Sequence, residues 1–113
     1  MTQGADMIVA ERRRQIEEEH YSSSHDDDHD EGELALAAIC YAAPFTIFKK
    51  IDDGCYCDPW PWDDKHDKRL WDETLDEPLP AYRIDVNVRI RQLTKAGALI
   101  AAEIDRLLRD PHG

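Results

Sequence analysis

Apolar residues recur with helical spacing near the C-terminal end of the chain. Seven positions alternate in spacing between four and three residues: Val86, Ile90, Leu93, Gly97, Ile100, Ile104 and Leu107. This spacing predicts one apolar stripe on a helix of about 23 residues, ~35 Å long, that ends before Pro111. Glycine lowers helix propensity by about 1 kcal/mol relative to alanine, so Gly97 predicts that another helix crosses closely at that point.

The heptad-like spacing of this stripe is compatible with two structural roles. We expect the stripe to lie in the protein's own core, because a chain of 113 residues has little other apolar material from which to build one. The alternative is an oligomer in which the stripe faces another copy of the chain.

A second helix is predicted to begin near Asp30 and to continue through Leu34 to Ala43, where the sequence is apolar on all sides. Asp30 is the expected N-cap, with Glu33 three residues later as in a capping box, and Pro44 ends the helix. A helix without a polar face is typical of a buried, central position.

A first helix is predicted from about Met7 to Glu19, with Asp6 as its N-cap and residues 1–5 as a flexible N-terminus. Its apolar content is low, so we expect a surface helix that rests on the other two. Arg14 and Glu18 stand four residues apart and can form an ion pair.

Prolines and tryptophans dominate residues 51–82, which predict a long connecting loop. Trp60, Trp62 and Trp71 are large enough to anchor such a segment on the core. A loop of this length is typically functional or partly helical, here around residues 65–72. Little of the chain shows a strand pattern. The sequence therefore predicts a single all-α domain over residues 1–113, with three main helices and this loop.

Charge is distributed unevenly. The chain has 25 acidic and 14 basic residues and a formal net charge of −11. Such a chain repels phosphate groups, which argues against direct binding of nucleic acid or of an anionic membrane surface. Nine acids lie between Glu17 and Glu33, and no Lys or Arg occurs from Gln15 to Phe48.

The three cysteines and the N-terminus indicate the compartment. An odd number of cysteines without a secretory signal pattern predicts reduced thiols in the cytoplasm. We expect Cys40 to be buried and Cys55 and Cys57 to lie in a loop. One residue separates Cys55 from Cys57, and this spacing does not fit a structural zinc site. The longest apolar run, residues 34–45, is shorter than the ~20 residues of a membrane helix.

The acids of residues 17–33 predict a partner-binding surface. Its candidate residues are Glu17, Glu18, Glu19, Asp26, Asp27, Asp28, Asp30 and Glu33. So many carboxylates without a basic neighbour exceed what solubility requires. They could imitate the phosphates of a nucleic acid and attract a protein partner with a basic nucleic-acid-binding groove.

Histidines in the same segment suggest an alternative, a small metal-dependent hydrolase of nucleotides or phosphoesters. On a helix, His25, His29 and Glu33 would stand four residues apart on one face, and with Asp26 they could bind a divalent metal that activates water. Against this, runs of serine and aspartate favour turns and caps over helix. The interpretation without a metal is an acidic loop that leads into a helix N-cap. No other cofactor and no other catalytic residue is predicted.

Five motifs in order resemble a family of short proteins common in tailed phages and prophages. They are Glu11-Arg12-Arg13-Arg14-Gln15-Ile16, Tyr21-x-x-x-His25-Asp26-Asp27-x-His29, Gly32-Glu33-Leu34-Ala35-x-Ala37-Ala38, Trp60-Pro61-Trp62 and Lys95-Ala96-Gly97-Ala98-Leu99-Ile100-x-Ala102-Glu103-Ile104. His20 stands where members of the family usually have glycine. The resemblance implies a phage accessory protein in the bacterial cytoplasm and no particular activity. With the acidic surface, it leads us to expect a non-enzymatic counter-defence inhibitor of the anti-CRISPR kind.

Overall fold

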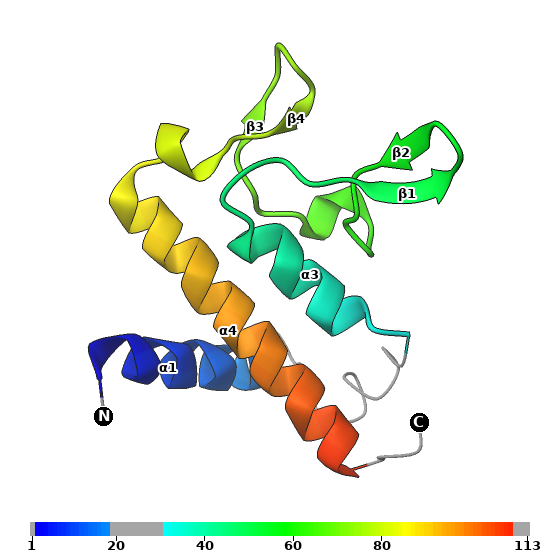
Figure 1. Cartoon of the computed structure of the whole chain (residues 1–113). Coiled ribbons are helices and arrows are strands. Elements are labelled where there is room, and N and C mark those ends of the chain that lie inside the picture. Colours follow the sequence, from blue (N-terminus) through cyan, green and yellow to red (C-terminus); the bar gives the residue numbers. More distant parts are fainter. Residues whose placement is uncertain (1, 19–30, 110–113) are drawn as a thin grey trace.

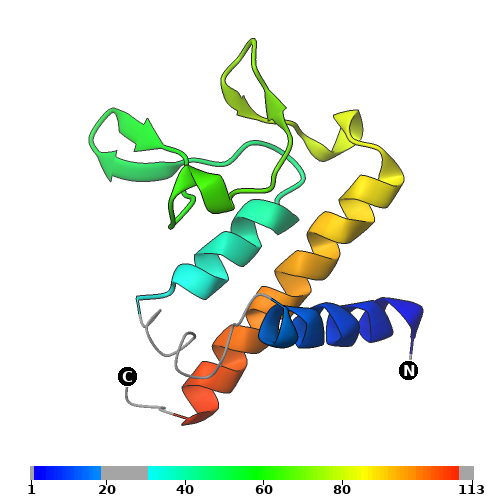
Figure 2. The ribbon, with the colours of Figure 1, turned by 180° about the vertical axis from the view of Figure 1, so that it is seen from behind.

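Three helices and two small hairpins form the protein in the computed structural model, which describes residues 2–18 and 31–109. The helices are α1 (Gln3–Glu17), α3 (Glu33–Ala42) and α4 (Val86–Arg109). α4 is the longest element, and both of the other helices pack against it. α3 runs alongside α4, whereas α1 crosses it, as the two opposite views show (Figures 1 and 2).

The sequence located the helices well. α4 confirms the predicted C-terminal helix, and α3 ends just before Pro44, as expected. α1 begins at Gln3, four residues earlier than predicted, because the Thr2 hydroxyl accepts a hydrogen bond from the Ala5 backbone N–H and caps the helix. Residues 3–5 are therefore helical and not part of a flexible N-terminus. α3 begins at Glu33 with Gly32 as its N-cap, so the N-cap predicted at Asp30 is wrong.

The core between α3 and α4 is built from small side chains. Its buried members are Leu34, Ala37, Ala38 and Tyr41 of α3 and Ala96, Leu99 and Ala102 of α4. Leu34 is the largest fully buried side chain among the residues described. Alanines on both helices let the two backbones approach closely, which suits the antiparallel course of α3 alongside α4 (Figure 1).

The apolar stripe of α4 does not face this core, so the expectation that it lies inside is wrong. Its side chains are exposed by 40–66%: Val86, Ile90, Leu93, Ile100, Ile104 and Leu107. Leu108, which follows the stripe, is 76% exposed. Periodicity aligns the large apolar residues of a helix correctly. It does not reveal that α3 packs on the alanine-rich side of the same helix.

The predicted close crossing at Gly97 is confirmed. A Cβ atom built on Gly97 would lie 2.6 Å from the Ile8 Cδ1 atom and 2.8 Å from its Cγ1 atom. α1 therefore occupies the space that any other residue at this position would fill.

The prediction of an all-α fold is wrong, because two antiparallel hairpins interrupt the long loop. β1 (Lys49–Asp52) pairs with β2 (Cys55–Cys57), and β3 (Trp71–Asp72) pairs with β4 (Glu77–Pro78). Helices make up 57% and strands 11% of the described residues. The strands are two to four residues long, and all four residues of β1 are exposed. Such strands bury no apolar face and so leave no alternating pattern in the sequence.

Short 3-10 turns complete the segment between the helices: η1 (Asp64–His66) and η2 (Ala81–Arg83). η1 overlaps the helical stretch predicted around residues 65–72 only at its start, and Trp71 and Asp72 at its end form strand β3 instead. None of the helices in the described ranges has both the length and the apolarity needed to cross a membrane.

Candidate functional site

The structure describes the two ends of the acidic segment, residues 17–33. Glu17 and Glu18 are exposed at the end of α1, and Glu31 is exposed just before α3. The Glu18 Oε2 atom lies 3.8 Å from Arg14 Nη1, as the four-residue spacing predicted. Glu33 opens α3, and its Oε1 atom accepts a hydrogen bond of 2.7 Å from the Glu31 backbone N–H. Carboxylates at this position interact favourably with the helix dipole.

The other predicted site residues lie outside the described ranges: Glu19, His25, Asp26, Asp27, Asp28, His29 and Asp30. The metal site proposed from His25, His29, Asp26 and Glu33 therefore stays a prediction, because only Glu33 is seen. Within residues 2–18 and 31–109, no group of three His, Cys, Asp or Glu side chains is arranged to hold a metal ion.

Basic residues on α1 pair with carboxylates. Arg14 donates two hydrogen bonds of 2.8 Å to Glu11, and Arg12 Nη2 lies 3.5 Å from Asp105 Oδ2 of α4. Burial alone would raise the pKa of Glu11. The hydrogen bonds and charge of Arg14, with smaller effects of Gln15 and Lys95, outweigh burial and lower this pKa below its usual value of 4.5.

Arg89 has a structural role that the sequence did not predict. Its Nη1 atom donates a hydrogen bond of 2.8 Å to the carbonyl of Tyr41, and its Nη2 atom donates to the carbonyl of Ala42. These are C-terminal carbonyls of α3, which have no partner within the helix itself. Arg89, a residue of α4, thus caps the C-terminal end of α3. Its positive charge also interacts favourably with the dipole of α3 at that end.

A buried arginine organises the Pro/Trp-rich loop. The Arg69 side chain is 4% exposed and donates hydrogen bonds to both Asp58 and Asp67, the shortest of 2.7 Å to each. Its guanidinium carbon lies 5.5 Å from the ring centroid of Trp60 and 5.7 Å from that of Trp71. Burial alone would lower the pKa of Arg69, but the bonds to Asp67 and Asp58 raise it.

The tryptophans anchor this loop largely as predicted. Trp60 and Trp62 pack against the core. The Trp60 ring meets the Tyr41 ring edge to face at 5.6 Å and the Trp62 ring at 5.5 Å. Trp71 is 38% exposed and contributes mainly its stacking on Arg69.

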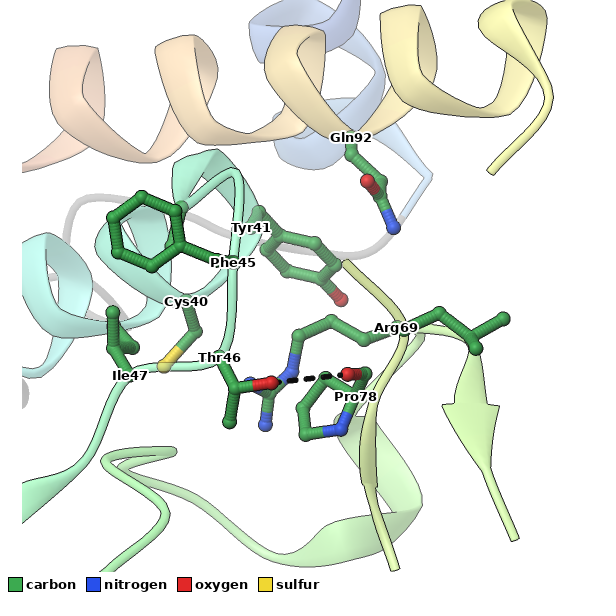
Figure 3. Close-up of a pocket in the computed structure, with 10 residues that line it drawn as sticks. Cys40, Tyr41, Phe45, Thr46, Ile47, Arg69, Pro78 and Gln92 are labelled. Carbon is green, nitrogen blue, oxygen red and sulfur yellow. Dashed lines mark hydrogen bonds between the residues drawn. The ribbon is translucent and has the colours of Figure 1, made fainter. Parts of the chain in front are cut away.

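A pocket lies between this loop, α3 and α4 (Figure 3). It is lined by Cys40, Tyr41, Ala43, Phe45, Thr46, Ile47, Arg69, Pro78, Leu79 and Gln92. Burial raises the pKa of the Cys40 thiol to about 11, so the thiol stays protonated near neutral pH. Two carboxylates already compensate the charge of Arg69. The polar groups of this pocket are thus arranged to hold the loop against α3.

The cysteines lie almost as expected. Cys40 is buried, Cys55 is exposed, Cys57 is half-buried, and all three are free thiols. The last two belong to strand β2 and not to an irregular loop.

Sequence reasoning missed the Arg69 cluster, because its members gather only when the loop folds back on itself. Asp67 stands two residues before Arg69. At this spacing its carboxylate can accept hydrogen bonds from both the backbone N–H and the guanidinium of Arg69. Asp58 is eleven residues away and left no local signal. Comparison with known proteins adds no relative: no protein-family model, no curated protein and no solved structure matches this chain.

Proposed function

We propose that this protein acts by binding a macromolecule, and that the acidic segment, residues 17–33, is the surface that attracts it. The partner is a protein with a basic groove of the kind that holds nucleic acid. Nine carboxylates within seventeen residues, with no Lys or Arg from Gln15 to Phe48, carry this proposal.

The described ends of the segment support it. Glu17, Glu18 and Glu31 are exposed to solvent. Arg12 pairs with Asp105, and Arg14 pairs with Glu11 and with Glu18 of the segment. The segment contains more carboxylates than these contacts neutralise, and a basic groove would gain both a faster encounter and a fixed orientation from the remaining charge.

Two sets of aspartate-to-asparagine substitutions test the proposal. The first set replaces Asp26, Asp27, Asp28 and Asp30 in the acidic segment. A matched set replaces Asp52, Asp53, Asp63 and Asp64, which lie in the hairpin and loop region and are all exposed. Both variants lose four negative charges, so they share one net charge and differ only in where the loss occurs.

The measurement is capture of partners from bacterial lysate on immobilised protein, at low and at high salt. We expect the wild type and the matched control to retain the same partners at low salt, and to release them at high salt as the charges are screened. The first variant should retain them at least tenfold more weakly. Equal retention by both variants, or binding that salt does not weaken, would contradict the proposal.

The cellular setting is part of the proposal. Three free thiols, two of them accessible, support a reducing compartment such as the bacterial cytoplasm. The resemblance to phage and prophage proteins favours a host nucleic-acid-binding protein as the target, and a counter-defence inhibitor of the anti-CRISPR kind is the specific form of this proposal.

A further inference from the structure

Two of the three cysteines lie on one face of the β1–β2 hairpin. Cys55 and Cys57 begin and end strand β2, with Tyr56 between them. The extra residue that shifts the register of this hairpin lies in β1, between Lys50 and Asp52, so β2 keeps its regular alternation. Side chains along a strand point alternately to its two faces, so both thiols lie on one face and the Tyr56 ring lies on the other.

Both thiols are free and open to solutes. Cys55 is exposed and Cys57 is half-buried. The hairpin projects from the three helices, as the two opposite views show (Figures 1 and 2). Cys40, in contrast, is buried in α3, and burial raises the pKa of its thiol to about 11. Cys55 and Cys57 are therefore the pair available to a ligand from solution.

The spacing of these thiols is too wide for a disulfide and suits an ion bound between them. A strand rises ~3.3 Å per residue, so the Cβ atoms of Cys55 and Cys57 are ~6.6 Å apart, whereas a disulfide needs ~3.8 Å. Metal–thiolate bonds are ~2.3 Å long, so an ion in line with two sulfur atoms holds them ~4.6 Å apart. Each side chain needs only to lean toward the other by ~1 Å along the strand to reach this separation.

We propose that Cys55 and Cys57 together bind one copper(I) ion. Thiolates are soft ligands that favour Cu(I), and two sulfur atoms in line satisfy this ion. A structural zinc ion instead takes four ligands. Within residues 2–18 and 31–109, no third His, Cys, Asp or Glu side chain joins this pair in a cluster that could hold a metal. The ligand set is thus too small for zinc and complete for Cu(I).

The charges around the site suit this ion. Binding releases one proton from each thiol and forms two copper–sulfur bonds, and the copper stays Cu(I), so the neutral pair acquires one net negative charge. Lys49 pairs with Cys57 across the hairpin, which places its cation on the thiol face. Asp52 pairs with Cys55, and its hard carboxylate oxygen is a poor ligand for Cu(I). Lys49 therefore compensates the charge that copper binding creates.

Competition against bicinchoninate, a coloured chelator of Cu(I), measures the affinity of the reduced full-length protein in the absence of oxygen. We expect one Cu(I) ion per chain. Cys55→Ser and Cys57→Ser should each weaken binding at least tenfold, because a single thiolate remains. Cys40→Ala is the matched control, since it removes the buried thiol, and it should bind copper as the wild type does. X-ray absorption of the complex should show two sulfur neighbours around the copper.

A shifted pair of cysteines tests the shared face. The double variant Cys55→Ser and Tyr56→Cys keeps two thiols in β2 but places them on opposite faces of the strand. We expect it to bind Cu(I) as weakly as Cys55→Ser alone. The proposal is wrong if the double variant or either serine variant matches the wild type, if Cys40→Ala loses the ion, or if one ion joins two chains. If circular dichroism shows that Cys57→Ser is unfolded, the two variants at the exposed Cys55 decide the result.

Discussion

Ile8 of α1 lies directly against Gly97 of α4, so closely that a Cβ atom at position 97 would stand 2.6 Å from the end of the isoleucine side chain. This contact fixes where α1 crosses α4. It also explains why a residue with poor helix propensity stands in the middle of a helix of 24 residues.

Gly97→Ala should therefore destabilise the protein. The gain in helix propensity is about 1 kcal/mol, and the overpacking against Ile8 costs ~1–3 kcal/mol. We expect a net loss of about 1 kcal/mol in the free energy of unfolding, measured with urea at one fixed protein concentration.

In an Ile8→Ala background the sign should reverse. Without the isoleucine side chain, Gly97→Ala should stabilise the protein by up to ~1 kcal/mol. If Gly97→Ala stabilises the protein with Ile8 present, the close contact does not exist in solution.

Removal of the Arg69 side chain should lower the free energy of unfolding far more than removal of an exposed arginine side chain. Arg69→Met leaves Asp67, whose side chain is 4% exposed, without its ionic partner, and we expect a loss of about 3–5 kcal/mol. Arg83→Met is the matched control, because its ion pair with Asp72 is 2.6 Å long but involves an arginine side chain that is 47% exposed. Its loss should lower the free energy of unfolding far less, because water already screens this pair. Urea unfolding followed by tryptophan fluorescence measures both, and similar costs would contradict a buried role for Arg69.

Cys40 should react slowly with thiol reagents. Its pKa rises from the usual 9.0 to about 11, so at mildly alkaline pH its thiolate population is about 100-fold lower than that of an unperturbed thiol. Burial adds a further barrier to the reagent. A thiol titration of the native protein should show two fast groups, Cys55 and Cys57, and a third that appears only on unfolding. Three equally fast thiols would show that Cys40 is accessible.

Glu11 should contribute to stability in a pH-dependent way. Its pKa is lowered in the folded protein, so the folded state favours the charged carboxylate. The contribution is complete above its usual value of 4.5 and is lost as the pH falls through the lower, folded-state value. Glu11→Gln should therefore be less stable than the wild type by up to about 1 kcal/mol at neutral pH, and nearly equal to it in strong acid.

Unfolding measurements on the wild type and on Glu11→Gln, from neutral pH to strong acid, give the difference in stability between the two proteins. A difference that grows toward acidic pH would show that Arg14 does not hold the carboxylate in its charged form.

Helix positions could be predicted from the sequence, but helix orientation could not. The bounds of α4 and the close contact at Gly97 follow from periodicity and from the cost of a glycine. Which side of α4 is buried depends on α3, whose Ala37 and Ala38 belong to the same buried cluster as Ala96 and Ala102 of α4. Alanines contribute little to a hydrophobic pattern, although they allow the closest helix packing.

The first hairpin has a local signal in the sequence. Asp53 and Gly54 form a two-residue connection between β1 and β2, and Gly54 has φ +78°. Asp-Gly between two short segments is a strong hairpin pattern. The second hairpin is harder to predict, because its strands are two residues each and its turn places Asp76 at φ +54°.

Displacement of a labelled DNA duplex tests the central claim, nucleic-acid mimicry by the acidic segment, most directly. The duplex is bound to the partner captured at low salt, and the wild type is then titrated into the complex. The wild type and the variant altered at Asp52, Asp53, Asp63 and Asp64 should release the duplex. The variant altered at Asp26, Asp27, Asp28 and Asp30 should need at least tenfold more protein. Retention of the duplex beside the bound wild-type protein, or equal release by both variants, would contradict the claim.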